Sequence, residues 1–162
     1  MVLCLSFPAH QQDDGTIAFK GNYAIGNISQ TGVFHRKLVQ EEGGGDSQIY
    51  VVANSQTTIP DPIDNCQTET FGSTSPPSVA NSKDVFLGLD IEEDPKCGGL
   101  YAADVVPSHY ASLKTIVNFE TFVPGEEGGT TFTRFGEGIS FDGSAVAFWA
   151  GWGDEFETIS LC

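Results

Sequence analysis

The sequence predicts an all-β protein, and three observations favour this class. Short runs rich in Val, Ile, Phe and Thr recur along the 162 residues, and 19 glycines and 8 prolines separate them. No stretch keeps the apolar period of an amphipathic helix, and residues 107–114 offer at most one helical turn. Asp-Gly pairs at Asp14 and Asp142 stand between apolar runs, as in β-hairpins with a type I′ turn. The length fits a single domain, residues 1–162.

The chain also repeats itself. Alignment of Phe19 with Phe86 places residues 32–34 on residues 99–101 at the same offset. The stretch 142–148 (DGSAVAF) is the best copy of one repeated element, and weaker copies occupy 14–19 and 82–86. These matches predict a repeat somewhat longer than about 60 residues.

A second set of landmarks recurs in the same order. Alignment of Ile59 with Val123 places Phe71 on Phe135, each followed by Gly, and residues 52–54 fall on 116–118. We expect each of these Phe side chains to fill the core from a Gly/Pro/Thr-rich arm, because a recurrent aromatic residue in a loop normally packs. In the copy at 82–86, Lys83 replaces the expected glycine, so its turn geometry is open.

Each repeat unit contains four candidate strands. The approximate units are 1–60, 76–124 and 137–162, and arms 61–75 and 125–136 join them. The expected strands are 3–7, 16–20, 32–36 and 49–59, then 77–80, 84–89, 99–103 and 115–123, then 138–141, 145–150 and 157–161. Four-stranded antiparallel repeat units are typical of β-propeller blades. The fold expectation is therefore two full propeller-like units plus an incomplete third.

The repeated motif resembles that of bacterial NxxGxxAF-type tandem-repeat proteins. The residues that carry it are 130–150, with weaker copies at 68–88 and 11–21. The resemblance implies a propeller-like, exported protein of uncharacterised function, and it contributes no catalytic residues.

The net charge is −15, which excludes several partners. No basic patch is present to neutralise phosphates, so nucleic acid is excluded, and binding to anionic membrane surfaces is equally disfavoured. No apolar run reaches the length of a membrane-spanning helix, so membrane insertion is not expected. The charge permits cation binding, and acidic surface loops are the simpler interpretation.

Four cysteines lie far apart, with no CxxC pair. Cys66 and Cys97 flank the first two strands of the middle unit, and a disulfide between them would hold it together. Cys4 and Cys162 lie in the first and last apolar strands, where they could pair within one chain or between copies. The alternative is buried free thiols. The disulfide interpretation predicts an oxidising, extracellular or cell-surface location.

Carboxylates gather in the loops between the second and third strands of the units. They are Asp90, Glu92 and Asp94 in the middle unit and Asp154 and Glu155 in the last. Calcium takes such loop oxygens, although neither cluster has the spacing of an EF-hand loop. The choice is between calcium sites and solvated loops, and no other cofactor is expected.

Two further features concern glycans. Trp149 and Trp152 could form an aromatic platform for sugar rings, although aromatic residues at strand ends more often close a core. Asn27 begins an N-x-S sequon, which matters if the protein enters a glycosylating secretory pathway.

No catalytic constellation is evident. His10, His35 and His109 lie on different elements. The sequence has no GxSxG or HExxH motif, and no GxGxxG motif that follows a strand and opens a helix. We therefore expect a non-enzymatic protein. A hydrolase with paired carboxylates is the least favoured alternative.

The function that these observations favour is structural. The third unit lacks a fourth strand, and an unpaired edge invites strand addition. The apolar N-terminal residues Val2, Leu3, Leu5 and Phe7 of a neighbouring copy are candidates for that strand, in a homo-oligomer or filament. The alternative is a ligand-binding module that recognises glycan or calcium through its loops.

Overall fold

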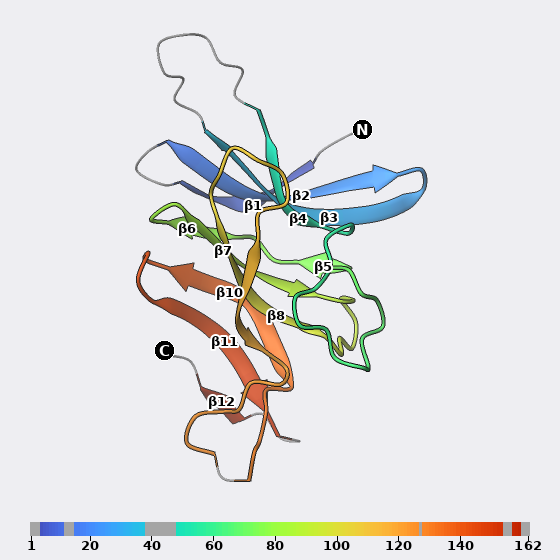
Figure 1. Cartoon of the computed structure of the whole chain (residues 1–162), viewed down its shortest axis with the longest axis vertical. Coiled ribbons are helices and arrows are strands. Elements are labelled where there is room, and N and C mark those ends of the chain that lie inside the picture. Colours follow the sequence, from blue (N-terminus) through green and yellow to red (C-terminus); the bar gives the residue numbers. More distant parts are fainter. Residues whose placement is uncertain (1–3, 12–14, 38–47, 127, 154–156, 160–162) are drawn as a thin grey trace.

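The computed structural model describes residues 4–11, 15–37, 48–126, 128–153 and 157–159. Over these residues the protein is all-β, with antiparallel sheets, no helix and no closed barrel (Figure 1). Residues 107–114, the one stretch with any helical character in the sequence, form a loop that leads into a strand at Leu113.

Three sheets follow one another along the chain. The first sheet has the order β1 (Cys4–Gln11), β2 (Thr16–Ile25), β3 (Ile28–Lys37) and β4 (Tyr50–Asn54). The second sheet contains β5 (Ser73–Thr74), β6 (Ser78–Ala80), β7 (Lys83–Leu89), β8 (Gly98–Asp104) and β9 (Leu113–Asn118). The third sheet has the order β10 (Arg134–Phe141), β11 (Val146–Trp152) and β12 (Glu157–Ile159). Strand β5, inside the arm 61–75, was not expected.

The first two sheets share one hydrogen-bonding register. Phe19 pairs with Phe34 across β2 and β3, as Phe86 pairs with Tyr101 across β7 and β8. The next ladder carries the same irregularity in both sheets, after Val33 in the first and after Leu100 in the second. Because a slip of one residue would move every side chain to the other face, the shared register confirms the alignment of Phe19 with Phe86.

The turn that follows β4, the last strand of the first sheet, is repeated after β9, the last strand of the second sheet. In the first sheet the backbone N–H of Asn54 donates to Thr57 Oγ1 (2.9 Å), and Thr57 N–H donates back to the carbonyl of Asn54 (2.8 Å). Asn118 and Thr121 make the same two bonds at 3.0 and 3.1 Å. Asn and Thr side chains close such turns by bonding to nearby backbone groups.

The arms differ in length, which changes one expected match. Phe71 N–H donates to the carbonyl of Thr57, and the equivalent bond to Thr121 comes from Phe132 rather than from Phe135. The alignment of Phe71 with Phe135 is therefore wrong, because the second arm is shorter. Phe135 is instead the second residue of β10, where it pairs with Ala150 of β11.

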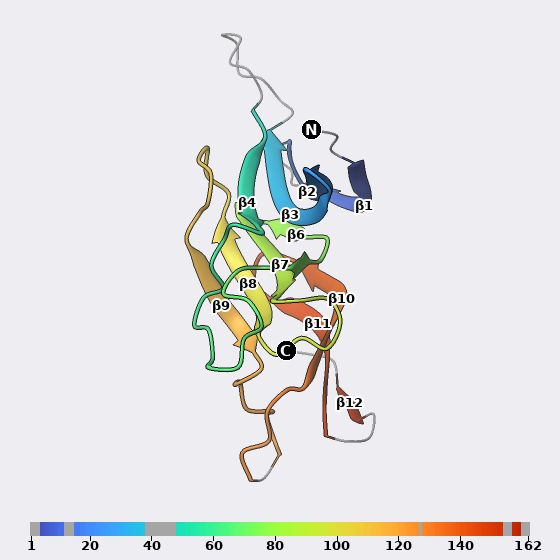
Figure 2. The same ribbon diagram turned by 90° about the vertical axis from the view of Figure 1, so that its right-hand side faces the viewer.

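Two apolar cores join the three sheets face to face. Between the first and second sheets, Val33, Val52 and Ile59 pack with three buried aromatic residues, Phe71, Phe86 and Tyr101. Between the second and third, Leu87, Leu100 and Val117 pack with Phe132, Phe148 and Trp152. Phe86 packs in the first of these cores and Leu87 in the second, because adjacent residues on a strand point to opposite faces of the sheet. Figure 1 shows the sheets in order from top to bottom, and Figure 2 shows β4 and β9 toward one edge of this stack.

The hairpin turns reverse the expectation from sequence. The turn of the weakest copy, Asn81 and Ser82, has two residues, both with positive φ (47° and 57°), as a type I′ turn requires. The Asp142 hairpin instead has a four-residue loop, because Phe141 pairs with Val146. There Asp142 Oδ1 accepts hydrogen bonds from the backbone N–H groups of Ala145 and Ser144, which lower the pKa of Asp142. The type I′ prediction for Asp142-Gly143 is therefore wrong.

Candidate functional site

A groove of about 550 Å³ lies where the β2–β3 hairpin extends past the second sheet. Residues from both strands of the hairpin line one wall, and the start of β5 and the loop after β7 line the other. The lining residues include Lys20, Asn22, Ser29, Gln30, Ser73 and Glu92. In Figure 1 the hairpin of β2 and β3 projects to the right of the stack.

The groove is lined by groups that donate and groups that accept hydrogen bonds. The side-chain amide of Asn22 can donate and accept hydrogen bonds, and so can the hydroxyl groups of Ser29 and Ser73. Lys20 forms an ion pair with Glu137, in which Nζ lies 3.5 Å from Oε1. The polar lining of the groove suits the binding of an uncharged, hydroxyl- or amide-bearing ligand.

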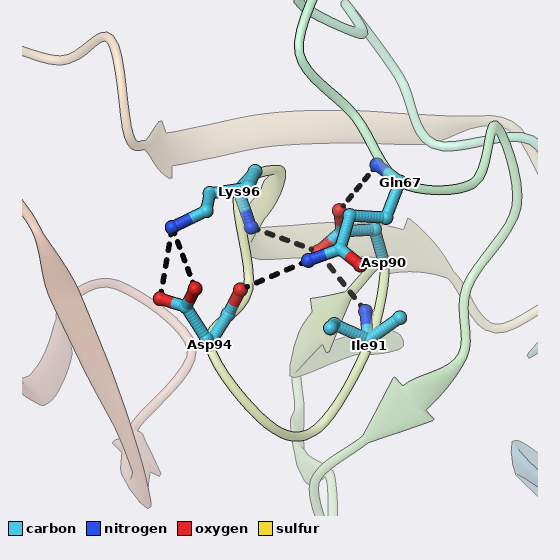
Figure 3. Close-up of polar contacts among 5 residues, drawn as sticks. All are labelled: Gln67, Asp90, Ile91, Asp94 and Lys96. Atoms are coloured by element: carbon cyan, nitrogen blue, oxygen red, sulfur yellow. Dashed lines mark hydrogen bonds and ion pairs between the residues drawn. The ribbon is translucent and has the colours of Figure 1, made fainter.

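The acidic loop after β7 is organised by Asp90 (Figure 3). This side chain is fully buried, and Oδ2 accepts a hydrogen bond from the backbone N–H of Gln67 at 2.9 Å. Oδ1 accepts from the backbone N–H groups of Ile91 and Lys96 at 3.0 and 3.1 Å. Three N–H donors stabilise a buried carboxylate, so Asp90 holds two loop segments together.

The other predicted calcium ligands are not gathered around Asp90. Asp94 forms an exposed ion pair with Lys96 (2.8 Å), and Glu92 is exposed beside the groove. Asp154 and Glu155 lie outside the described residues. Within the described ranges no group of three or more His, Cys, Asp or Glu residues is placed to hold a metal ion.

Cys66 and Cys97 form a disulfide, with their Cα atoms 5.1 Å apart. The two half-cystines adjoin Gln67 and Lys96, whose backbone N–H groups both bind Asp90. The disulfide and the buried carboxylate therefore fasten the same two segments, the first arm and the loop before β8. Neither the side chain of Cys4 nor any part of Cys162 is among the described features, so their pairing stays a prediction.

The predicted platform of Trp149 and Trp152 is wrong. Residues three apart on a strand point to opposite faces, and both belong to β11. Trp152 is 5% exposed and packs edge-on to Phe132 in the core between the second and third sheets. Trp149 is 36% exposed on the other face, where its ring lies over Gly136 of β10.

The predicted assembly strand is used within the chain. Leu5 pairs with Gly21 of β2, and Phe7 belongs to the same strand, β1. The idea that this segment is free to complete a neighbour's sheet is therefore wrong for Leu5 and Phe7. Val2 and Leu3 lie outside the described residues. Asn27, the sequon residue, is exposed at the tip of the β2–β3 hairpin.

Two buried polar groups had no signal in the sequence. The hydroxyl of Tyr101 has no hydrogen-bond partner among the described residues, and Tyr101 lines a cavity of about 10 Å³, the size of one water molecule. Burial, with the carboxylates of Asp61 and Asp90, raises the pKa of Tyr101, so the hydroxyl is neutral.

The second group is a pair between sheets. His35 of β3 and Asp84 of β7 are both buried, and His35 Nδ1 lies 3.4 Å from Asp84 Oδ2. Burial raises the pKa of Asp84, and the neighbouring imidazole only partly opposes this. His35 stands between Phe34 and Arg36 on the strand, and nothing in the sequence separates it from a surface histidine.

Comparisons with known proteins found no matching family model, no similar curated protein and no similar solved structure. Over the described residues, the protein contains no helix with the length and hydropathy that a membrane crossing requires.

Proposed function

We propose that the protein is a non-enzymatic scaffold that assembles with copies of itself in an oxidising, extracellular or cell-surface setting. Its sheets are interpreted as consecutive blades of a propeller-like array, as in the tandem-repeat proteins that the sequence resembles. The contacts between β1 and β6 and between β6 and β10 support this interpretation, because the first strands of propeller blades adjoin one another. The Cys66–Cys97 disulfide supports the setting.

The observation that carries the proposal is the exposed face of the third sheet. Gly72 N–H donates to the carbonyl of Leu89, and Thr133 N–H makes the equivalent bond to Gly151, so Leu87 and Trp149 are equivalent. Leu87 is buried against the next sheet, whereas Trp149 is 36% exposed. Repetition of the same interface would bury Trp149 against a further sheet, and we assign that sheet to a second copy. Two copies would bring the number of sheets to about six, within the range of closed propellers.

Trp149→Glu tests the proposal, because a charge on this face opposes burial. Sedimentation velocity should show an oligomer for the native chain and a single species of 17.3 kDa for the variant. Phe122→Glu is the matched control, since Phe122 is 67% exposed on the second arm, and it should leave the oligomer intact. Equal sedimentation of all three proteins would remove this interface from consideration.

A second candidate function is the binding of an uncharged polar ligand, of which a glycan is the best match. The polar groove beside the β2–β3 hairpin favours it, since sugar hydroxyls need paired donors and acceptors. On a glycan array, the double variant Asn22→Ala/Ser29→Ala should lose at least about tenfold in signal, and Asn65→Ala, outside the groove, should not. An array without any binding would argue against this second function.

A further inference from the structure

The buried contact between His35 and Asp84 joins the first sheet to the second. His35 Nδ1 and Asp84 Oδ2 are 3.4 Å apart, slightly beyond the usual range of a hydrogen bond, and their side chains are 4% and 0% exposed. Among the described residues, neither oxygen of Asp84 has a hydrogen-bond partner, and His35 Nδ1 has none either. An isolated carboxylate without hydrogen-bond donors is costly to bury. The negative charge of Asp84 therefore has to be neutralised or paired at its contact with His35.

The protonation of His35 can be read from its other ring nitrogen. Nε2 lies 3.1 Å from the backbone carbonyl oxygen of Val106. A carbonyl can only accept, so Nε2 carries a hydrogen. If the ring holds just that hydrogen, Nδ1 presents a lone pair to Asp84. A favourable contact then requires one further proton, either on Nδ1 beside an ionised Asp84 or on the Asp84 carboxyl group.

We propose that His35 and Asp84 form a binding site for a single proton, and that this proton holds the first and second sheets together. The proton is shared between His35 Nδ1 and Asp84 Oδ2. Its loss leaves the lone pair of Nδ1 facing a carboxylate that has no hydrogen-bond donor. The raised pKa of Asp84 agrees with retention of this proton.

Few other titratable groups surround the site. From β4, the ring of Tyr50 lies 5.5 Å from the imidazole of His35, and His109 lies on the far side of Tyr50 at 5.4 Å. From the second sheet, Lys83 adjoins Asp84 and pairs with the exposed carboxylate of Asp104. On β1, His10 is paired with Ala18, the residue that pairs with His35. The charge that acts on the Asp84 carboxyl group is that of His35.

The site gives stability a defined dependence on pH. Above about pH 6.5 an unfolded chain holds no proton on either side chain, whereas the folded pair holds one. The folded state then binds more protons, so the unfolding constant rises about tenfold per pH unit. Between about pH 4 and 6.5 the unfolded chain also holds one proton, on the histidine, and the contribution of the pair is constant.

Asp84→Asn tests the site, because the amide can donate to Nδ1 without a titrating proton. Urea unfolding between pH 7 and 9 should show the unfolding constant of the native chain rising about tenfold per pH unit relative to this variant. Asp104→Asn, a matched change at an exposed carboxylate of the same sheet, should run parallel to the native chain. A ratio of native to Asp84→Asn unfolding constants that stays level with pH overturns the proposal.

A second measurement needs no variant and remains decisive if Asp84→Asn does not fold. Nitrogen-15 NMR of the native chain at pH 8 should show His35 Nε2 protonated and Nδ1 hydrogen-bonded to a shared proton. A free lone pair at Nδ1, together with a carbon-13 signal of an ionised Asp84 carboxylate, would overturn the proposal.

Discussion

Replacement of Phe71 by alanine is expected to lower the free energy of unfolding by about 3 to 5 kcal/mol. Phe71 is 1% exposed, and its ring centre lies 5.3 Å from that of Tyr101 and 6.0 Å from that of Phe86. Gly88 leaves room for this ring, because a Cβ there would lie 2.5 Å from it. Truncation would open a cavity between the first and second sheets. Urea denaturation at fixed pH measures the loss.

Phe122→Ala is the matched control for Phe71→Ala. Phe122 lies in the second arm but is 67% exposed, so its truncation should change the free energy of unfolding by less than about 0.5 kcal/mol. Phe132→Ala should resemble Phe71→Ala, because Phe132 occupies the equivalent buried position. Similar small losses at Phe71 and Phe122 would contradict the assignment of Phe71 to the core.

Removal of the Cys66–Cys97 disulfide is the second large effect. The double variant Cys66→Ala/Cys97→Ala should lose about 3 to 4 kcal/mol, as expected for a bridge that closes a loop of about this length. The loss of stability should centre on the first arm and the loop before β8, which Asp90 would then hold without the covalent link. Hydrogen exchange of the backbone N–H groups of Gln67 and Lys96 reports on these segments.

The same variant supplies the control for reduction. Dithiothreitol should destabilise the native chain by a similar amount and leave the double variant unchanged. An equal effect of dithiothreitol on both proteins would mean that another bridge, one that includes Cys4 or Cys162, carries the stabilisation.

Much of the fold could be predicted from the sequence because repeated strands keep their side-chain spacing. The match of Phe19 with Phe86 holds because the register of each sheet is set by which residues face the core. Arms have no such constraint, so the shorter second arm puts Phe132, and not Phe135, in the position of Phe71. Turn type was also hard to predict, since Asn81 and Ser82 adopt positive φ without any glycine.

The candidate sites show where sequence reasoning fails. The opposite orientation of Trp149 and Trp152 follows from strand alternation, and so was available from the sequence. The contact of His35 with Asp84 depends on how two sheets pack, and neither residue has a local signal for it. The role of Asp90 likewise depends on the first arm folding back against the loop after β7.

The central claim is that the sheets pack through one repeated pair of faces, and that a second copy continues the series at Trp149. Multi-angle light scattering of the native chain under oxidising conditions, across a range of concentrations, tests it most directly. The account predicts a mass of about two chains, each of 17.3 kDa. A mass of one chain at every concentration would contradict it.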